Sequence, residues 1–130
     1  MKLSILTPSY RQSSAAMSRV FQLADLPGDK FEFIVRDNSE SAHKRQVLEG
    51  IRSSCLRHVP VPNRGAKENF AGVLALAEGD YVLFYADDDL VFPAGLEAAH
   101  AALARADDAG RAGLTFGYLV TSGGNDRLFN

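Results

Sequence analysis

The sequence has a single cysteine, no tryptophan and no apolar run long enough to cross a bilayer. The lone Cys55 excludes a disulfide within the chain and is typical of a reducing compartment. At the N-terminus, MKLSILTPSYRQ holds only a short apolar run before Pro8, too short for a signal peptide or a membrane span. From these absences we expect a soluble, cytoplasmic protein with no transmembrane segment.

An excess of positive charge is also missing. The net charge is -2 and the isoelectric point is about 5.9, which argues against a nucleic-acid partner. The 130 residues suffice for one domain with a usable core but not for a large two-domain enzyme. Neither an internal repeat nor a low-complexity linker interrupts the chain, so residues 1–130 are predicted to form a single domain.

Five segments have the composition of β-strands: residues 2–7, 31–37, 56–61, 81–86 and 114–120. Pro8 is expected to close the first strand. Pro60 and Pro62 confine the third to an edge or an end of a sheet. The fourth, YVLFYA, is apolar throughout and is expected to be buried on both faces.

Helical periodicity fills the intervals between these strands. The first helix carries an apolar stripe, and the second begins near the cap candidates Asn38 and Ser39 and runs to about Cys55. The third ends at Glu78-Gly79, and the fourth starts at Pro93. The apolar positions of the first, third and fourth helices are Met17, Val20, Phe21 and Ala24; Phe70, Val73, Leu74 and Ala77; and Leu96, Ala99 and Leu103.

Strands that alternate with helices predict an α/β fold with a parallel sheet covered on both faces. Ligands of such sheets bind beyond the carboxyl ends of the strands. Three polar clusters follow strands in this sequence: residues 7–11 (TPSYR), 37–41 (DNSES) and 87–89 (DDD). We therefore expect the three clusters to converge at one edge of the sheet and to form the functional site.

The three consecutive aspartates need a compensating partner. Two carboxylates about 4 Å apart repel by roughly 4 kcal/mol at an effective dielectric constant near 20. In an extended backbone, Asp87 and Asp89 would point to one side and Asp88 to the other. Carboxylates in a cleft are suitable ligands for Mg²⁺ or Mn²⁺, which in turn bind phosphate oxygens. The simpler alternative is a solvated acidic turn at the start of a helix.

Taken together, the stretches ILTPSYRQ, FEFIVRDNSES and NRGAKENFAGVLALAEGDYVLFYADDDLVFPAGL resemble the nucleotide-binding half of the inverting family 2 glycosyltransferases. The resemblance extends almost continuously from Met1 to about Leu103. It implies the GT-A fold, a Rossmann-like three-layer α/β/α arrangement with a mostly parallel sheet. It also implies transfer of a sugar from a nucleotide diphosphate sugar, expected to be a UDP-sugar, to an acceptor hydroxyl with the help of Mn²⁺ or Mg²⁺.

Carried over position by position, the resemblance assigns roles to individual residues. It places Pro8 and Tyr10 beside the base and ribose, with Thr7 also on the substrate side. Asp37 is implied to accept a hydrogen bond from the base. It implies phosphate contacts for Arg64 and Lys67. The cluster Asp87–Asp89 is implied to hold the cation on the diphosphate and to contact the ribose, with Asp88 and Asp89 as the metal ligands and Asp87 as a substrate contact that stays a metal candidate.

Two positions depart from the family pattern. The acidic motif is commonly Asp-x-Asp-Asp, but Ala86 occupies its first position here. This departure is the reason for ranking Asp88 and Asp89 above Asp87 as the metal-binding pair. Arg36 stands where many members have another aspartate, which is expected to alter contacts with the nucleotide.

The family's general base lies in a later, acceptor-binding half, and we expect this chain to end before it. No catalytic base or acceptor is identified: Asp107, Asp108 and Asp126 are in no recognisable base motif. One alternative is therefore a nucleotide-sugar-binding module without turnover, completed by a partner or by self-association. Another is a phosphatase like the haloacid dehalogenases, with Asp87 as nucleophile and Asp89 as acid/base.

The three histidines, His43, His58 and His100, are not spaced as metal ligands. They are expected on the surface or on a helix face.

Overall fold

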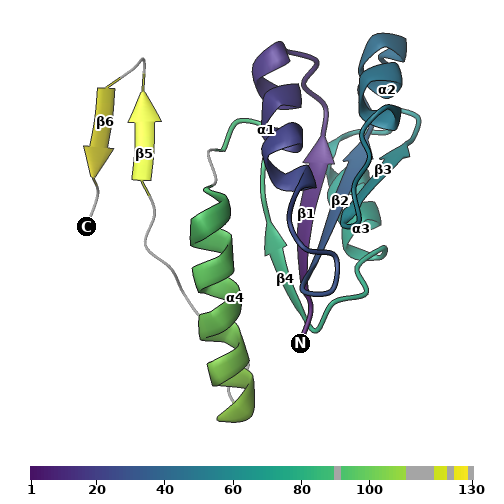
Figure 1. Ribbon diagram of the computed structural model, residues 1–130. Helices are drawn as coiled ribbons and strands as arrows, with labels where there is room; N and C mark the ends of the chain where they lie inside the picture. The colour runs from purple at the N-terminus through teal and green to yellow at the C-terminus, as the bar shows by residue number, and fades with distance from the viewer. Residues whose placement is uncertain (90–91, 111–118, 123–124, 129–130) are drawn as a thin grey trace.

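The computed structural model describes residues 1–89, 92–110, 119–122 and 125–128 (Figure 1). Six strands and four helices lie in these ranges. In chain order they are β1 (Leu3–Ser9), α1 (Ser14–Ala24), β2 (Phe31–Asp37), α2 (Ala42–Glu49), β3 (Leu56–Pro60), α3 (Ala66–Leu74), β4 (Tyr81–Phe84), α4 (Pro93–Asp108), β5 (Leu119–Ser122) and β6 (Asn125–Leu128).

The first four strands form one parallel sheet in the order β3-β2-β1-β4. The longest ladder joins β1 to β2 in register from Leu3 opposite Phe31 to Ser9 opposite Asp37. Because all four strands run the same way, their carboxyl ends meet at one edge. The predicted α/β fold is confirmed, and so is the edge position of β3, whose two nearby prolines fit an edge strand.

Helices cover both faces of this sheet. On one face, a large apolar cluster joins residues of β1 and β2 to α1, α2 and α4, including Leu23, Leu48 and Leu96. On the other face, a smaller cluster of Leu6, Ile34 and Val73 packs α3 against the strands. Figure 1 shows the same division, with α1 and α2 in front of the sheet and α3 behind it.

Strand β1 continues through Pro8 instead of ending there. The carbonyl of Leu6 accepts a bond from Tyr85 on the β4 side, while the carbonyl of Ser9 accepts one from Asn38 on the β2 side. Pro8, like Leu6, therefore turns its nitrogen toward the β4 side, where the ladder has already ended at Leu6 opposite Phe84. A missing N–H costs nothing at that position.

Strand β4 is correctly predicted, but its burial on both faces is wrong. Val82 is 46% exposed and Phe84 is 44% exposed, because β4 lies at the edge of the sheet. On that face Phe84 stacks on Phe70 of α3, with ring centroids 5.6 Å apart. The α3 stripe is correspondingly half exposed: of its four predicted positions, Val73 is buried, whereas Phe70 and Leu74 are not.

Two helices are shorter than predicted. Helix α2 starts after Ser41, whose hydroxyl accepts from the amide of Lys44, and it ends at Glu49 instead of continuing to Cys55. It cannot start earlier because Glu40 has a φ of 56°, outside the right-handed helical region. Helix α3 ends at Leu74.

The stripes of α1 and α4 are confirmed in most positions. In α1, Phe21 is exposed, and Leu23 is buried in addition to the expected residues. Pro93 is at the first turn of α4.

The segment predicted as the last strand is only partly described. Leu119 and Val120 belong to β5, which pairs antiparallel with β6, whereas residues 114–118 lie outside the described residues.

Within the described ranges, no helix is both long and apolar enough to span a membrane. Cys55 is a free, buried thiol, and burial raises its pKa.

Gly79 brings the turn before β4 against the backbone of β1, where its amide donates to the Ser4 hydroxyl. A Cβ atom here would lie 2.8 Å from the Lys2 carbonyl oxygen and from the Ser4 nitrogen. We expect Gly79→Ala to lower the free energy of unfolding by about 1–3 kcal/mol through overpacking, measured by urea denaturation. Gly95→Ala is the matched control: its Cβ would meet nothing closer than 3.9 Å, so this helix substitution should stabilise slightly. Equal effects of the two substitutions would contradict the argument.

Candidate functional site

The ends of β1 and β4 are joined by the carboxylate of Asp87. Its Oδ1 accepts a hydrogen bond of 2.6 Å from the Ser9 hydroxyl. Its Oδ2 accepts from the backbone amides of Tyr10 at 2.7 Å and Arg11 at 2.8 Å. Two of the three predicted polar clusters, residues 7–11 and 87–89, are therefore in direct contact.

Lys44 of α2 connects this contact to the third cluster. Its side chain is only 1% exposed. The ammonium donates to Ser9 Oγ at 2.5 Å and to the Arg11 carbonyl at 2.6 Å, and it lies 3.3 Å from Asp37 Oδ1. The predicted convergence of the three clusters at one edge of the sheet is thus confirmed, with a buried lysine at its centre.

Both carboxylate oxygens of Asp37 have partners in the protein. Besides Lys44, the Ser39 amide donates to Oδ1 at 2.9 Å, and Nε2 of His58 lies 3.1 Å from Oδ2. Burial alone would raise the pKa of Asp37, but the hydrogen bonds with His58 and Ser39 and the charge of Lys44 outweigh it and hold that pKa far below its ordinary value. Asp37 is therefore ionised. His58 on β3, which was expected at the surface, is instead a buried partner of this carboxylate.

Asp88 and Asp89 lie in a turn, so the strand-like alternation expected for residues 87–89 is wrong. The Asp89 amide donates to the Ala86 carbonyl at 3.1 Å, and Asp89 Oδ2 accepts from the Ala86 amide at 3.0 Å. The Asp88 side chain is 61% exposed and makes a single long contact of 3.4 Å with Arg11. Both carboxylates keep oxygens that no protein group occupies in the described residues.

These two carboxylates suit a cation that takes most of its ligands from elsewhere. Among the described residues, no group of three or more His, Cys, Asp or Glu side chains is placed to enclose a metal. Mg²⁺ is commonly bound through one or two carboxylates together with substrate phosphates and water. The exposed pair of hard oxygen donors fits that mode, and it does not fit a closed structural metal site.

The remaining predicted substrate residues are spread around this edge. Tyr10 is 61% exposed just beyond β1, and Pro8 precedes it in the strand. Thr7 is buried in the sheet at 1% exposure, with its hydroxyl away from the surface. Arg64 and Lys67 are exposed on either side of Gly65, at the start of α3. Contacts of these five residues with substrate stay predictions.

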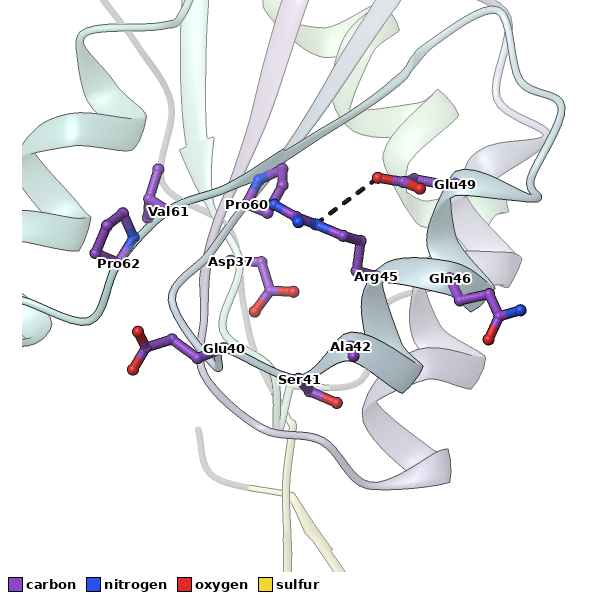
Figure 2. A pocket seen from close by; sticks show the side chains of 10 residues that line it. All are labelled: Asp37, Glu40, Ser41, Ala42, Arg45, Gln46, Glu49, Pro60, Val61 and Pro62. Atoms are coloured by element: carbon purple, nitrogen blue, oxygen red, sulfur yellow. Dashed lines mark ion pairs between the residues drawn. The ribbon is translucent and has the colours of Figure 1, made fainter.

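A pocket of about 460 Å³ opens beside Asp37, between α2 and the chain that follows β3 (Figure 2). Pro60 and Pro62 form one wall, and Arg45 extends over it from α2, 3.8 Å from Glu49. In Figure 2, Glu40 lies across the pocket from Arg45. The volume of the pocket is in the range of those that bind small organic ligands.

Arg36 does not face this pocket. Its guanidinium contacts α3, pairing with Glu68 at 2.9 Å and donating to Asn69 Oδ1 at 2.9 Å. The hydrogen bond from Arg36 lowers the pKa of Glu68. Gly72 makes room for the guanidinium, since a Cβ there would lie 2.4 Å from its central carbon. The arginine therefore fastens α3 to β2 and is not placed on the pocket side.

Sequence reasoning missed three participants in this site: Ser9, Lys44 and His58. Lys44 sits in a short, strongly polar helix, where a lysine is normally solvated. The one available signal was the cap at Ser41, which fixes where the first turn of α2 begins and hence which side of it Lys44 occupies. His58 follows the alternation of β3, but its pairing with Asp37 depends on the register of two strands.

The chain belongs to glycosyl transferase family 2, whose sequence profile matches residues 4–127. Among solved structures it is similar to S. aureus TarS residues 1–349, with 28% identity, a TM-score of 0.67, and coverage of 83% of this chain and 33% of that one. The same TarS fragment has been solved in complex with UDP and with UDP-GlcNAc, at 28% and 27% identity, TM-scores of 0.67, and coverage of 83% of this chain and 32% of theirs. The GT-A fold implied by the sequence resemblance is confirmed.

The mannosyltransferase PcManGT from Pyrobaculum calidifontis, solved with GDP-Man and Mn²⁺, shares the fold at 22% identity. Its TM-score is 0.61, over 75% of this chain and 31% of that one. No protein with a curated description is similar enough to count as a match. The chain spans about a third of the length of the first TarS structure.

Proposed function

We propose that this chain is the donor-binding part of a family 2 glycosyltransferase, which holds a nucleotide diphosphate sugar along the carboxyl edge of the sheet. The observation that carries the proposal is the contact of all three polar clusters through Ser9, Lys44, Asp37 and Asp87. Family membership supports the reaction class, and the UDP and UDP-GlcNAc complexes of TarS support a UDP-sugar as donor.

The proposed donor has its base near Asp37 and its diphosphate near the turn of Asp88 and Asp89. The pocket beside Asp37 has flat walls at Pro60 and Pro62 and a guanidinium at Arg45, groups that pack well against a planar ring. Arg64 and Lys67 lie exposed at the start of α3, where they can approach phosphate. Tyr10 is exposed and free to cover the nucleoside.

Asp88 and Asp89 would hold a divalent cation, Mn²⁺ or Mg²⁺, together with the diphosphate oxygens. Once bound, the cation supplies positive charge against the negative charge that develops on the leaving group. In the transfer itself, the acceptor hydroxyl oxygen forms a bond to the anomeric carbon. The bond from that carbon to the diphosphate breaks, and the nucleoside diphosphate leaves with the electron pair. The hydroxyl proton passes to a base that is not identified in this chain.

The binding module without turnover is the second candidate, because no recognisable general-base motif is found in the sequence. The phosphatase alternative lacks support. Its nucleophile would be Asp87, but both oxygens of that carboxylate accept hydrogen bonds from β1 and the residues after it. A nucleophile needs an oxygen free to approach phosphorus.

Isothermal titration with UDP, in Mn²⁺ and then in EDTA, tests the proposal. We expect UDP to bind at least about 100-fold more tightly with Mn²⁺ than in EDTA, since one cation neutralises negative charge on both the protein and the diphosphate. UDP release from UDP-GlcNAc would then separate a transferase from a binding module, and cleavage of p-nitrophenyl phosphate would reveal a phosphatase. GDP measured in parallel identifies the preferred base. Failure of both UDP and GDP to bind in Mn²⁺ would contradict the proposal.

A further inference from the structure

The side chain of Lys44 is buried, and a buried charge is costly unless its partners compensate it. Asp37 is one such partner, but His58 and the Ser39 amide already bind this carboxylate. The two shortest contacts of the ammonium are instead with the end of β1, at Ser9 Oγ and the Arg11 carbonyl. We propose that Lys44 is a positioning residue that fixes the turn of Asp87–Asp89 through Ser9. The inference deepens the donor-binding site proposed above and rests on it.

The direction of the hydrogen bonds supports this role. A lysine ammonium only donates, so Ser9 Oγ must accept from Lys44. A serine hydroxyl has one proton, and in the structure it is donated to Asp87 Oδ1. Lys44 therefore decides the orientation of the Ser9 hydroxyl, and that hydroxyl decides where Asp87 Oδ1 lies.

Lys44 also acts on the other oxygen of Asp87. By binding the Arg11 carbonyl, the ammonium holds the short segment whose amides, at Tyr10 and Arg11, donate to Asp87 Oδ2. Asp87 is thus fixed at both oxygens by groups that Lys44 touches. The next two residues are the exposed carboxylates proposed to hold the cation, and a turn cannot move at its first residue without moving them.

The competing explanation is that Lys44 only neutralises Asp37. In that case its loss would destabilise the whole fold without affecting residues 87–89 in particular. The two explanations predict different exchange rates at the amides of Tyr10 and Arg11, which donate to Asp87. The reference amides are those of Leu3 and Phe33 in the core, which donate to backbone carbonyls.

The test uses Lys44→Met, which removes the ammonium but keeps an unbranched side chain of similar bulk, and Ser9→Ala, which keeps the pair of Lys44 and Asp37. Lys30→Met is the control, an exposed lysine that lies 3.8 Å from Glu97. Amide hydrogen exchange measured by NMR should accelerate at least about tenfold at Tyr10 and Arg11 in both test variants and not in the control. Because Lys44 acts partly through Ser9, the effect of the double variant should be smaller than the two single effects combined.

Mn²⁺ titrated in the presence of UDP is the second measurement. We expect both test variants to weaken Mn²⁺ binding at least about fivefold, and the control Lys30→Met to leave it unchanged. Unchanged exchange at Tyr10 and Arg11 in Ser9→Ala overturns the inference even where Lys44→Met fails to fold. An equal rise in exchange at core amides also overturns it. If wild-type protein binds no Mn²⁺ and UDP, the proposed function fails, whereas the exchange data still decide the role of Lys44.

Discussion

Replacing Asp88 with alanine is expected to remove the metal-dependent part of UDP binding, a loss of about 100-fold or more in affinity in Mn²⁺. The side chain is 61% exposed and its only described protein contact is the 3.4 Å pair with Arg11. A carboxylate with so few contacts in the fold is available to a cation. Replacing a residue that only contacts a metal ligand typically lowers metal affinity about 10- to 100-fold, and the loss of a direct ligand should lower it by more. Titration of UDP with and without Mn²⁺ measures the effect.

The same substitution should leave the fold intact. Exposed pairs contribute little, so the free energy of unfolding should change by less than about 0.5 kcal/mol. Asp108→Asn, an exposed acid in the last turn of α4, is the control for a general change in charge. If Asp88→Ala binds UDP in Mn²⁺ as tightly as the wild type does, the cation is not held by Asp88. The prediction is then wrong even though the family assignment stands.

Asp89 differs from Asp88 in a way that the sequence could not reveal. Its carboxylate caps the turn by accepting from the Ala86 amide, and Tyr85 donates to its carbonyl. Burial raises the pKa of Tyr85 to about 12, so its hydroxyl keeps the proton that it donates. Sequence alternation treated residues 87–89 as an extended strand. It could not foresee the turn, because the bond that closes it, from the Asp89 amide to the Ala86 carbonyl, depends on where β4 leaves the sheet.

The four strands of the parallel sheet were predictable because each has a clear apolar or alternating signature, and β2 matches its predicted bounds at both ends. Strand β6, in a polar stretch, was not predicted. The location of the site at the carboxyl edge followed from the order of elements alone. What could not be predicted is the set of pairwise contacts across that edge. Lys44 and Ser9 are 35 positions apart in the chain, and nothing local in either neighbourhood marks them as partners.

The error at β4 has a similar origin. Apolar character on both faces of a strand indicates that both faces are covered, but the sequence does not say by what. Val82 and Phe84 are half exposed over the residues that the structure describes, and Phe70 and Leu74 continue the same face on α3. Periodicity reports the hydrophobicity of a surface, and burial depends on which segments come to lie against it.

Replacing Asp37 with asparagine is expected to lower the free energy of unfolding by about 3 kcal/mol at pH 5. The change keeps the shape of the side chain but leaves Lys44, with 1% of its side chain exposed, without its carboxylate. Breaking a buried ion pair by removing one partner typically costs about 3–5 kcal/mol. The pairing with His58 at 3.1 Å is lost as well. Urea denaturation followed by circular dichroism measures the difference.

The pH dependence of this difference provides a sharper test. The folded protein holds the pKa of Asp37 far below the ordinary value of about 3.9 for an aspartate. A lowered pKa in the folded state contributes stability that is complete above the unfolded pKa and is lost as the pH falls toward the folded one. The difference in free energy of unfolding between wild type and Asp37→Asn should therefore narrow by about 1 kcal/mol from pH 5 to pH 3.

Asp29→Asn, an exposed carboxylate in the turn before β2, is the matched control and should show no such narrowing. A gap that stays constant between pH 5 and pH 3 would mean that Asp37 titrates normally in the folded protein. The ion pair of Lys44 with Asp37 and the hydrogen bond between Asp37 and His58 would then contribute no net stabilisation of the charged carboxylate, which would contradict the prediction.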